Sequence, residues 1–162
     1  MGRWKTPLPG TRKSFSSTSK RRTLVDVMLV CDSGVVFAAL NPRDRSHDDC
    51  TELLRLSRST AIPAAAIVEI DWLARSRGVT DATDRLLASV EDRSIVVFEL
   101  DEDDYRRVRK LVRRYADLPL SFVDAAVIAI AERLELTKIA TLDRRHFSVI
   151  RPLHIPAFEL VP

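Results

Sequence analysis

The chain has 162 residues, of which 46% are hydrophobic and 30% charged, a composition typical of a single soluble globular domain. No apolar run reaches the roughly 18 residues that cross a bilayer, and the charged N-terminus lacks the apolar stretch of a signal peptide. We therefore expect a cytoplasmic protein without a membrane partner. The four glycines (Gly2, Gly10, Gly34 and Gly78) build no phosphate loop, which excludes P-loop and dinucleotide-binding sites.

The net charge of +3 is unevenly distributed along the chain. Residues 1–27 hold seven Lys or Arg and one acid, whereas the remainder is mildly acidic. Residues 1–23 are rich in Ser, Thr, Pro and basic residues and have no apolar period, which predicts a disordered basic tail. The tail can equally be an extension created by start-site choice, because Met28 directly precedes the first core strand. We assign the folded domain to residues 24–162.

Strand and helix patterns alternate from residue 24 onward. Apolar, β-branched runs predict strands at 24–32, 60–63, 94–100, 138–143 and 157–160. Amphipathic or apolar periodic runs predict helices at 33–40, 46–58, 64–77, 81–91, 101–116 and 121–134. Strands that alternate with helices imply an α/β fold, a three-layer α/β/α sandwich around a mostly parallel sheet.

Two acids follow predicted strands that lie far apart in the chain. Asp32 ends the first strand, and Asp143 ends the strand at 138–143. Sites in open parallel sheets form at the carboxyl ends of strands, so we expect these two carboxylates to meet at one edge of the sheet.

Asp124 stands alone in the most apolar helix of the chain, and two interpretations of it remain open. Ser121 and Asp124 have the spacing of a capping box, in which the carboxylate only closes the start of the helix. The helix is apolar on every side, however, and a buried unpaired carboxylate is costly. A metal ion near the helix N-terminus would offset that cost.

Glu69 is the fourth candidate acid. Its neighbours at three and four residues include Ala65, Ala66 and Trp72, which indicates an inward-looking face, unusual for an unpaired Glu. Asp71 lies two residues further on in a mixed environment. Periodicity favours Glu69 over Asp71 but leaves both open.

Four segments, in this order, carry a resemblance to a known family. They read "VCDSGVVFAAL", "AAAIVEIDWL", "LPLSFVDAAVIAIAERL" and "KIATLDRRHFSVIRP". Over residues 28–160 the chain resembles the PIN-domain ribonucleases, and most closely the VapC-type toxins of bacterial toxin–antitoxin pairs. The resemblance implies a PIN-like fold and a metal-dependent endoribonuclease that leaves a 5′-phosphate and a 3′-hydroxyl.

The resemblance also assigns roles to individual residues. The catalytic acids would be Asp32, Glu69, Asp124 and Asp143, and the three aspartates would ligate or orient the metal. Oxygen ligands alone suit Mg²⁺, which Mn²⁺ can replace, rather than Zn²⁺. The hydroxyls of Ser33 and Thr141 would support these acids, although plain turn and strand roles are equally open for them.

The same resemblance implies an RNA substrate, a cognate antitoxin and a homodimer. Arg144 and Arg145, directly after Asp143, are candidate phosphate contacts, as are the basic residues of helix 101–116, whose other interpretation is a solvated face. A further set of residues is either core or a groove for an antitoxin helix: Val35, Val36, Phe37 and Leu40.

Other families fit less well. A haloacid-dehalogenase-like phosphatase needs a second Asp two residues after Asp32, where Gly34 stands. A receiver domain needs an acidic pair and a late Lys, and neither is evident. An inactive PIN fold that only binds protein, and a housekeeping PIN nuclease without an antitoxin, remain the alternatives.

Overall fold

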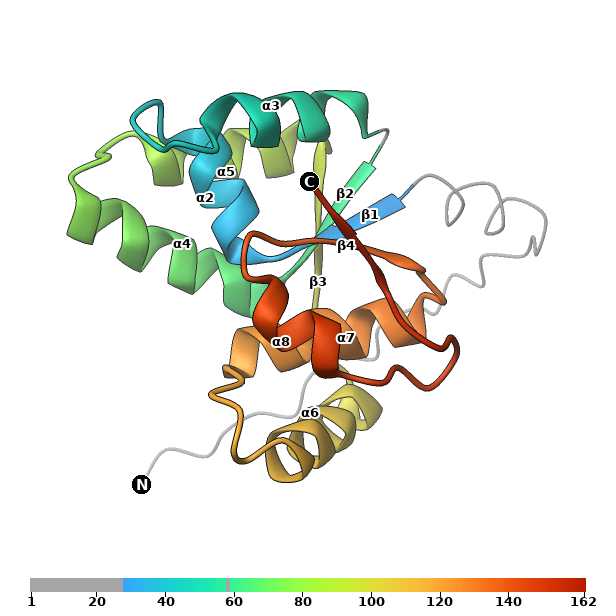
Figure 1. Cartoon of the computed structure of the whole chain (residues 1–162). Coiled ribbons are helices and arrows are strands. Elements are labelled where there is room, and N and C mark those ends of the chain that lie inside the picture. Colours follow the sequence, from blue (N-terminus) through green and yellow to red (C-terminus); the bar gives the residue numbers. More distant parts are fainter. Residues whose placement is uncertain (1–27, 58) are drawn as a thin grey trace, which may run out of the picture.

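In the computed structural model, which describes residues 28–57 and 59–162, five strands form one parallel sheet in the order β3-β2-β1-β4-β5 (Figure 1). The strands are β1 (Met28–Cys31), β2 (Ser59–Pro63), β3 (Ile95–Phe98), β4 (Lys138–Ala140) and β5 (Glu159–Val161). Each neighbouring pair is parallel, so all the carboxyl ends lie at one edge of the sheet. The predicted tail 1–23 and the first four residues of the predicted strand 24–32 lie outside the described residues.

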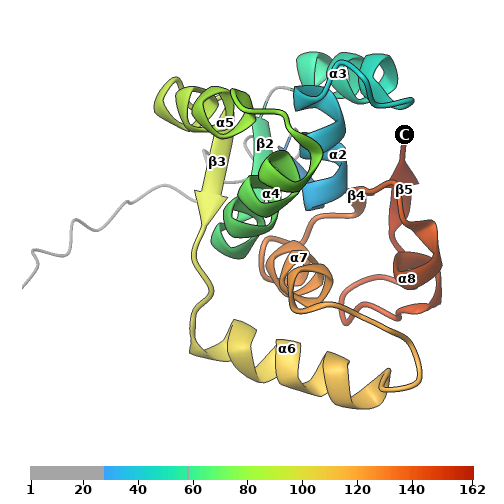
Figure 2. The same cartoon turned by 90° about the vertical axis from the view of Figure 1, so that its left-hand side faces the viewer.

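Helices cover both faces of this sheet (Figures 1 and 2). One face carries α2 (Ser33–Leu40), α3 (His47–Leu56), α4 (Ala64–Arg77) and α5 (Ala82–Glu91). The other face carries α6 (Glu102–Arg114), α7 (Phe122–Arg133) and α8 (Arg144–Val149). The predicted three-layer α/β/α fold is confirmed.

Strand alternation divides the interior into two cores. In β1, Leu29 and Cys31 pack against the first group of helices, whereas Val30 packs against the second. Because successive side chains of a strand point to opposite faces, a strand that is apolar throughout must be buried on both sides. The free thiol of Cys31 is fully buried, and burial raises its pKa, so it is a core residue without reactivity.

The buried helix α7 lies between the sheet and α6 (Figure 2). Its residues from Asp124 to Ala131 are all buried, as its continuous apolar sequence predicts. Helix α6 is amphipathic and closes the outside, with Val108 and Leu111 turned toward α7. This arrangement brings the N-terminus of α7 to the edge of the sheet where the strands end.

All the predicted helices and strands within the described residues are present, but three predictions need correction. The predicted strand 138–143 ends at Ala140, and Asp143 instead precedes α8, a helix that the sequence did not predict. The two apolar residues of α8, Phe147 and Val149, are too few to show a period, so the sequence pattern did not reveal the helix. The face of α4 around Glu69 is inward-looking only in part, because Ala66 is fully buried but Trp72 is 65% exposed.

The third correction concerns a proposed groove on α2. Its apolar residues are buried in the first core: Val35, Val36, Phe37 and Leu40. They are inaccessible to a partner helix, so the groove interpretation is wrong. No helix in the described part of the chain has the length and apolar character needed to cross a membrane.

Candidate active site

Asp32 lies at the carboxyl end of β1, in the middle of the sheet. Its backbone N–H donates to the carbonyl of Ala140 on the neighbouring strand β4, at 2.9 Å. The hydroxyl of Thr141, the next residue on that strand's path, donates to Asp32 Oδ2 at 3.1 Å. The sheet register therefore fixes the carboxylate and the threonine side by side, and only 8% of Asp32 remains exposed.

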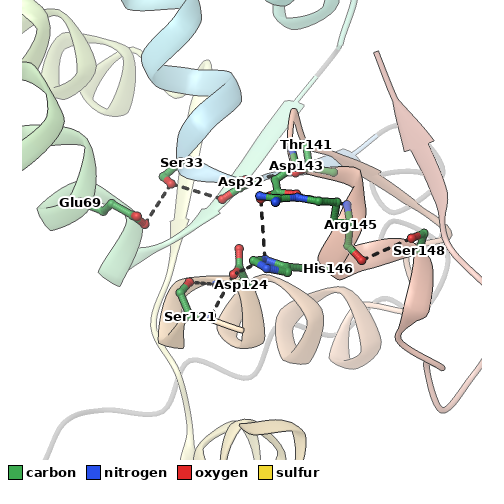
Figure 3. Close-up of polar contacts among 10 residues, drawn as sticks. All are labelled: Asp32, Ser33, Glu69, Ser121, Asp124, Thr141, Asp143, Arg145, His146 and Ser148. Carbon is green, nitrogen blue, oxygen red and sulfur yellow. Dashed lines mark hydrogen bonds and ion pairs between the residues drawn. The ribbon is translucent and has the colours of Figure 1, made fainter. Parts of the chain in front are cut away.

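Glu69 reaches Asp32 through a serine. The Ser33 hydroxyl lies 3.2 Å from Asp32 Oδ1 and 3.0 Å from Glu69 Oε2 (Figure 3). A hydroxyl has one hydrogen, so it satisfies one of these two carboxylates at a time. Asp71 instead accepts hydrogen bonds from Arg75 on α4 and from Thr83 on α5. Of the two acids that the sequence left open, the structure brings Glu69 to Asp32.

Asp124 combines both interpretations that its sequence allowed. The capping box is present: the Ser121 hydroxyl accepts from Asp124 N at 3.0 Å, and Asp124 Oδ2 accepts from Ser121 N at 2.9 Å. The same Oδ2 lies 3.1 Å from Nδ1 of His146. Within the described residues, the hydrogen bonds of the side chain all involve Oδ2, so Oδ1 is left for another ligand.

Asp143 is held differently from the other acids. It is the N-cap of α8, where its side chain accepts from Arg145 N at 3.1 Å. Its carboxylate is also clamped by the guanidinium of Arg145, at 3.1 Å from Nε and 2.9 Å from Nη2. Its own N–H donates to the Thr141 hydroxyl at 3.1 Å. Thr141 thus joins the Asp143 backbone to the Asp32 side chain.

The electrostatics of the site are those of crowded, partly buried acids. Burial and, after it, the charges of Asp124 and Glu69 raise the pKa of Asp32 from its ordinary 3.8 to about 6, although the hydrogen bonds from Thr141 and Ser33 act in the opposite direction. The hydrogen bonds from Arg145 hold the pKa of Asp143 below its usual value. Among the described residues no Lys or Arg pairs with Asp32, whereas Asp143 pairs with Arg145.

The donor chemistry of Asp32, Asp124 and Glu69 fits a hard divalent cation, since every available atom is a carboxylate or hydroxyl oxygen. Nevertheless, among residues 28–57 and 59–162 no group of three or more His, Cys, Asp or Glu side chains stands ready to hold a metal ion. Two of the acids already have partners: Arg145 pairs with Asp143, and His146 contacts Oδ2 of Asp124 (Figure 3).

His146 is the site residue that the sequence did not reveal. Its ring nitrogen lies 3.1 Å from Asp124 and 4.0 Å from Asp143, and its side chain is only 12% exposed. It occurs one helical turn after Asp143, a spacing that would have shown it only if α8 had been recognised.

The arginines predicted to bind substrate have structural partners. Arg144 donates to the carbonyls of Leu160 and Pro162 and so ties α8 to the C-terminal strand. On α6, Arg107 forms a largely buried ion pair with Glu132 at 2.6 Å. Four other cations of α6 line a hollow of about 320 Å³: Arg106, Arg109, Lys110 and Arg113.

These features together define an acidic site at the carboxyl edge of a parallel sheet, and comparison with known proteins identifies the class. The PIN domain family matches residues 29–151, so the chain belongs to the PIN-domain family.

Within that family the chain is similar to VapC proteins. It is 25% identical over 135 residues to Ribonuclease VapC26 of Mycobacterium tuberculosis, covering 83% of this chain and all of that protein. Its fold matches the crystal structure of M. tuberculosis VapC20, a "Sarcin-Ricin loop cleaving toxin", with a TM-score of 0.67 at 17% identity, over 73% of this chain and 92% of that one. It also matches a toxin–antitoxin complex from Klebsiella pneumoniae, with a TM-score of 0.59 at 17% identity, over 81% and 99% of the chains. The resemblance to VapC-type PIN ribonucleases seen in the sequence motifs is thereby confirmed.

Proposed function

We propose that this chain is a metal-dependent endoribonuclease and the toxin of a toxin–antitoxin pair. The observation that carries the proposal is the buried Asp32 carboxylate, whose pKa is raised toward neutrality beside Asp124 and Glu69 in a PIN fold. Acids crowded in this way favour a bound cation, which offsets their repulsion. The ribonuclease and toxin names of the relatives support the same activity.

Mg²⁺ or Mn²⁺ would be held by Asp32 and Asp124, with Glu69 and Asp143 completing the acidic set. The ion would lower the pKa of a bound water and would neutralise negative charge on the phosphate. The protein's own part is to hold the carboxylates in place. Thr141 and Ser33 orient Asp32, and the capping box fixes Asp124 at the start of α7.

RNA also needs cations outside the acids, because the acidic site repels phosphates. Arg145 lies at the rim, and its side chain is 84% exposed although it pairs with Asp143. The basic hollow on α6 offers four more cations. We propose that Arg145 and this hollow contact the phosphate backbone, and we keep Arg144 as a weaker candidate because it already binds the C-terminal strand.

The relatives extend the proposal to partners. A toxin–antitoxin complex shares the fold, which supports a cognate antitoxin that inhibits this chain. We also propose a homodimer that acts in the cytoplasm, where cellular RNA is available. An inactive, protein-binding PIN fold is the competing function, and the pairing of Asp143 with Arg145 is the observation in its favour.

The test is cleavage of total cellular RNA with mapped ends. We expect cuts that carry a 5′-phosphate, are abolished by EDTA and return with Mg²⁺ or Mn²⁺. Asp32→Asn should be inactive, whereas Asp117→Asn, at an exposed loop acid, should cleave normally. Cleavage that continues undiminished in EDTA would refute the metal mechanism, and the absence of any cleavage would favour the protein-binding alternative.

A further inference from the structure

His146 contacts Asp124, a proposed metal ligand, without being one of the acids itself. Its Nδ1 lies 3.1 Å from Asp124 Oδ2 but 4.0 Å from Asp143 Oδ2, beyond hydrogen-bond distance. An ionised carboxylate only accepts hydrogen bonds, so Nδ1 carries the hydrogen and donates it to Asp124. The side chain of His146 is 12% exposed, so little water competes for this bond.

The short helix α8, which carries His146, is anchored on several sides. Asp143 caps its start, and Arg144 ties it to the C-terminal strand β5. Phe147, the residue after His146, is buried in the second core. The backbone of His146 is therefore fixed by the sheet and the core, as is required of a residue that orients another side chain.

Two donors from different elements meet the same oxygen of Asp124. Oδ2 accepts from Ser121 N at 2.9 Å, at the start of α7, and from His146 on α8 (Figure 3). The torsion about the Cβ–Cγ bond of an aspartate is broad, so a single hydrogen bond leaves the carboxylate able to turn. The second donor restricts this rotation and fixes which oxygen, Oδ1, is left without a hydrogen bond among the described residues.

We propose that His146 is a positioning residue of the metal site: its Nδ1–H holds Oδ2 of Asp124, so that Oδ1 is presented to the cation. The inference rests on the proposed metal-dependent function and adds a residue to its machinery. Hydrogen bonds to metal-ligating groups fix the orientation of those groups, and losing one typically lowers metal affinity roughly 10- to 100-fold.

Two other roles for His146 predict different outcomes. If the ring competes with the cation for Asp124, its removal should strengthen metal binding. If the other ring nitrogen, Nε2, binds the cation directly, a donor at the position of Nδ1 should not replace the ring. Removing the ring and replacing each of its nitrogens in turn therefore separates the three roles.

Three variants of His146 make this comparison. His146→Leu and His146→Asn form a matched pair, because the two new side chains branch at the same carbon but only the amide places an N–H near the position of Nδ1. His146→Gln places its amide near the position of Nε2 instead. Mn²⁺ alone would be titrated into each full chain and followed by electron paramagnetic resonance. We expect His146→Leu and His146→Gln to bind roughly 10- to 100-fold more weakly than the wild type, and His146→Asn to bind nearly as well.

His47 offers a matched control outside the site. It is a partly buried histidine whose Nδ1 contacts the carbonyl of Ala38, so His47→Leu removes a comparable contact and should leave Mn²⁺ affinity unchanged. Urea unfolding shows which variants are folded. Nitrogen-15 NMR of the wild type in EDTA tests the contact even if His146→Leu does not fold. We expect a hydrogen on Nδ1 of His146, and a bare Nδ1 would overturn the proposal.

The outcomes distinguish this inference from the function on which it rests. In a wild type whose Mn²⁺ binding is weakened by Asp32→Asn, equal or tighter binding by folded His146→Leu overturns the positioning role alone. Normal binding by His146→Gln together with weak binding by His146→Asn assigns the role to Nε2 and also overturns it. If the wild type shows no Mn²⁺ binding that depends on Asp32, the proposed metal mechanism fails, and the inference falls with it.

Discussion

Replacing Asp32 by Asn should stabilise the metal-free protein at neutral pH while abolishing activity. Asp32 is 92% covered, and its pKa rises from 3.8 to about 6 because of burial and then the charges of Asp124 and Glu69. The folded state therefore favours the protonated acid. Ionising it in the fold costs about 3 kcal/mol at most, at about 1.4 kcal/mol per pKa unit.

The sign and the pH window follow from the same shift. Between pH 4 and pH 6 the folded state binds more protons than the unfolded state, so stability falls as the pH rises through this window. Above pH 7 the whole cost is present. Asn carries no charge, so its advantage should be about 1–3 kcal/mol at pH 8 and should vanish near pH 4.

The hydrogen bonds of the site allow Asn to fit. Its carbonyl can accept from Thr141, and its amide can donate to the Ser33 hydroxyl, which is then free to donate to Glu69. The substitution thus supplies the hydrogen that two ionised carboxylates lack around Ser33.

Urea unfolding in EDTA at pH 4, 6 and 8, followed by circular dichroism, measures the effect, with Asp117→Asn as the exposed control. Adding Mg²⁺ should stabilise the wild type more than Asp32→Asn, since only the wild type keeps the full charge. A variant that is less stable than the wild type at pH 8, or a difference that does not change with pH, would refute the argument.

Three further predictions concern other parts of the chain. Asp124→Asn should keep the capping bond and the fold but lose cleavage in an initial-rate assay. Asp104→Asn, at the equivalent cap of α6, should keep cleavage but lose stability, because it removes the charge that pairs with Arg133 at 2.6 Å. Glu132→Ala should lower the free energy of unfolding in urea by about 3–5 kcal/mol, because it leaves the largely buried Arg107 without its partner. Glu52→Ala, which breaks an exposed ion pair, should lower it by under about 1 kcal/mol. Deleting residues 1–23 should leave both the melting temperature and the cleavage rate unchanged.

The fold was accessible from the sequence because its signals are local and strong. The helix at 64–77 was predicted to the residue, since Gly78 adopts the left-handed conformation (φ 66°) that ends α4. Buried strands and the apolar α7 stand out by composition alone. These local signals do not predict the order of the strands in the sheet, because the pairing of β1 with β4 joins segments over 100 residues apart.

The site was only partly accessible, because side-chain partners depend on contacts between distant elements. The sequence placed Asp32 and Glu69 as candidates, but it could not show that Ser33 links them. It could not show that Arg145 turns Asp143 into a capped, paired acid, since two residues of spacing allow many geometries. The exposure of Trp72 was missed because helical periodicity reports a face of the helix without reporting what covers it.

The position of Asp124 shows how one carboxylate can serve structure and chemistry together. Its Oδ2 accepts from Ser121 N and contacts His146, and these contacts hold the side chain at the start of α7. The positive end of the helix dipole and these bonds lower the free-energy cost of burying this carboxylate without a metal. Its charge nevertheless raises the pKa of Asp32, so the capping interactions leave part of the site's repulsion uncompensated. A cation that enters would therefore be drawn toward Asp32 and Asp124, where the proposed mechanism places the phosphodiester.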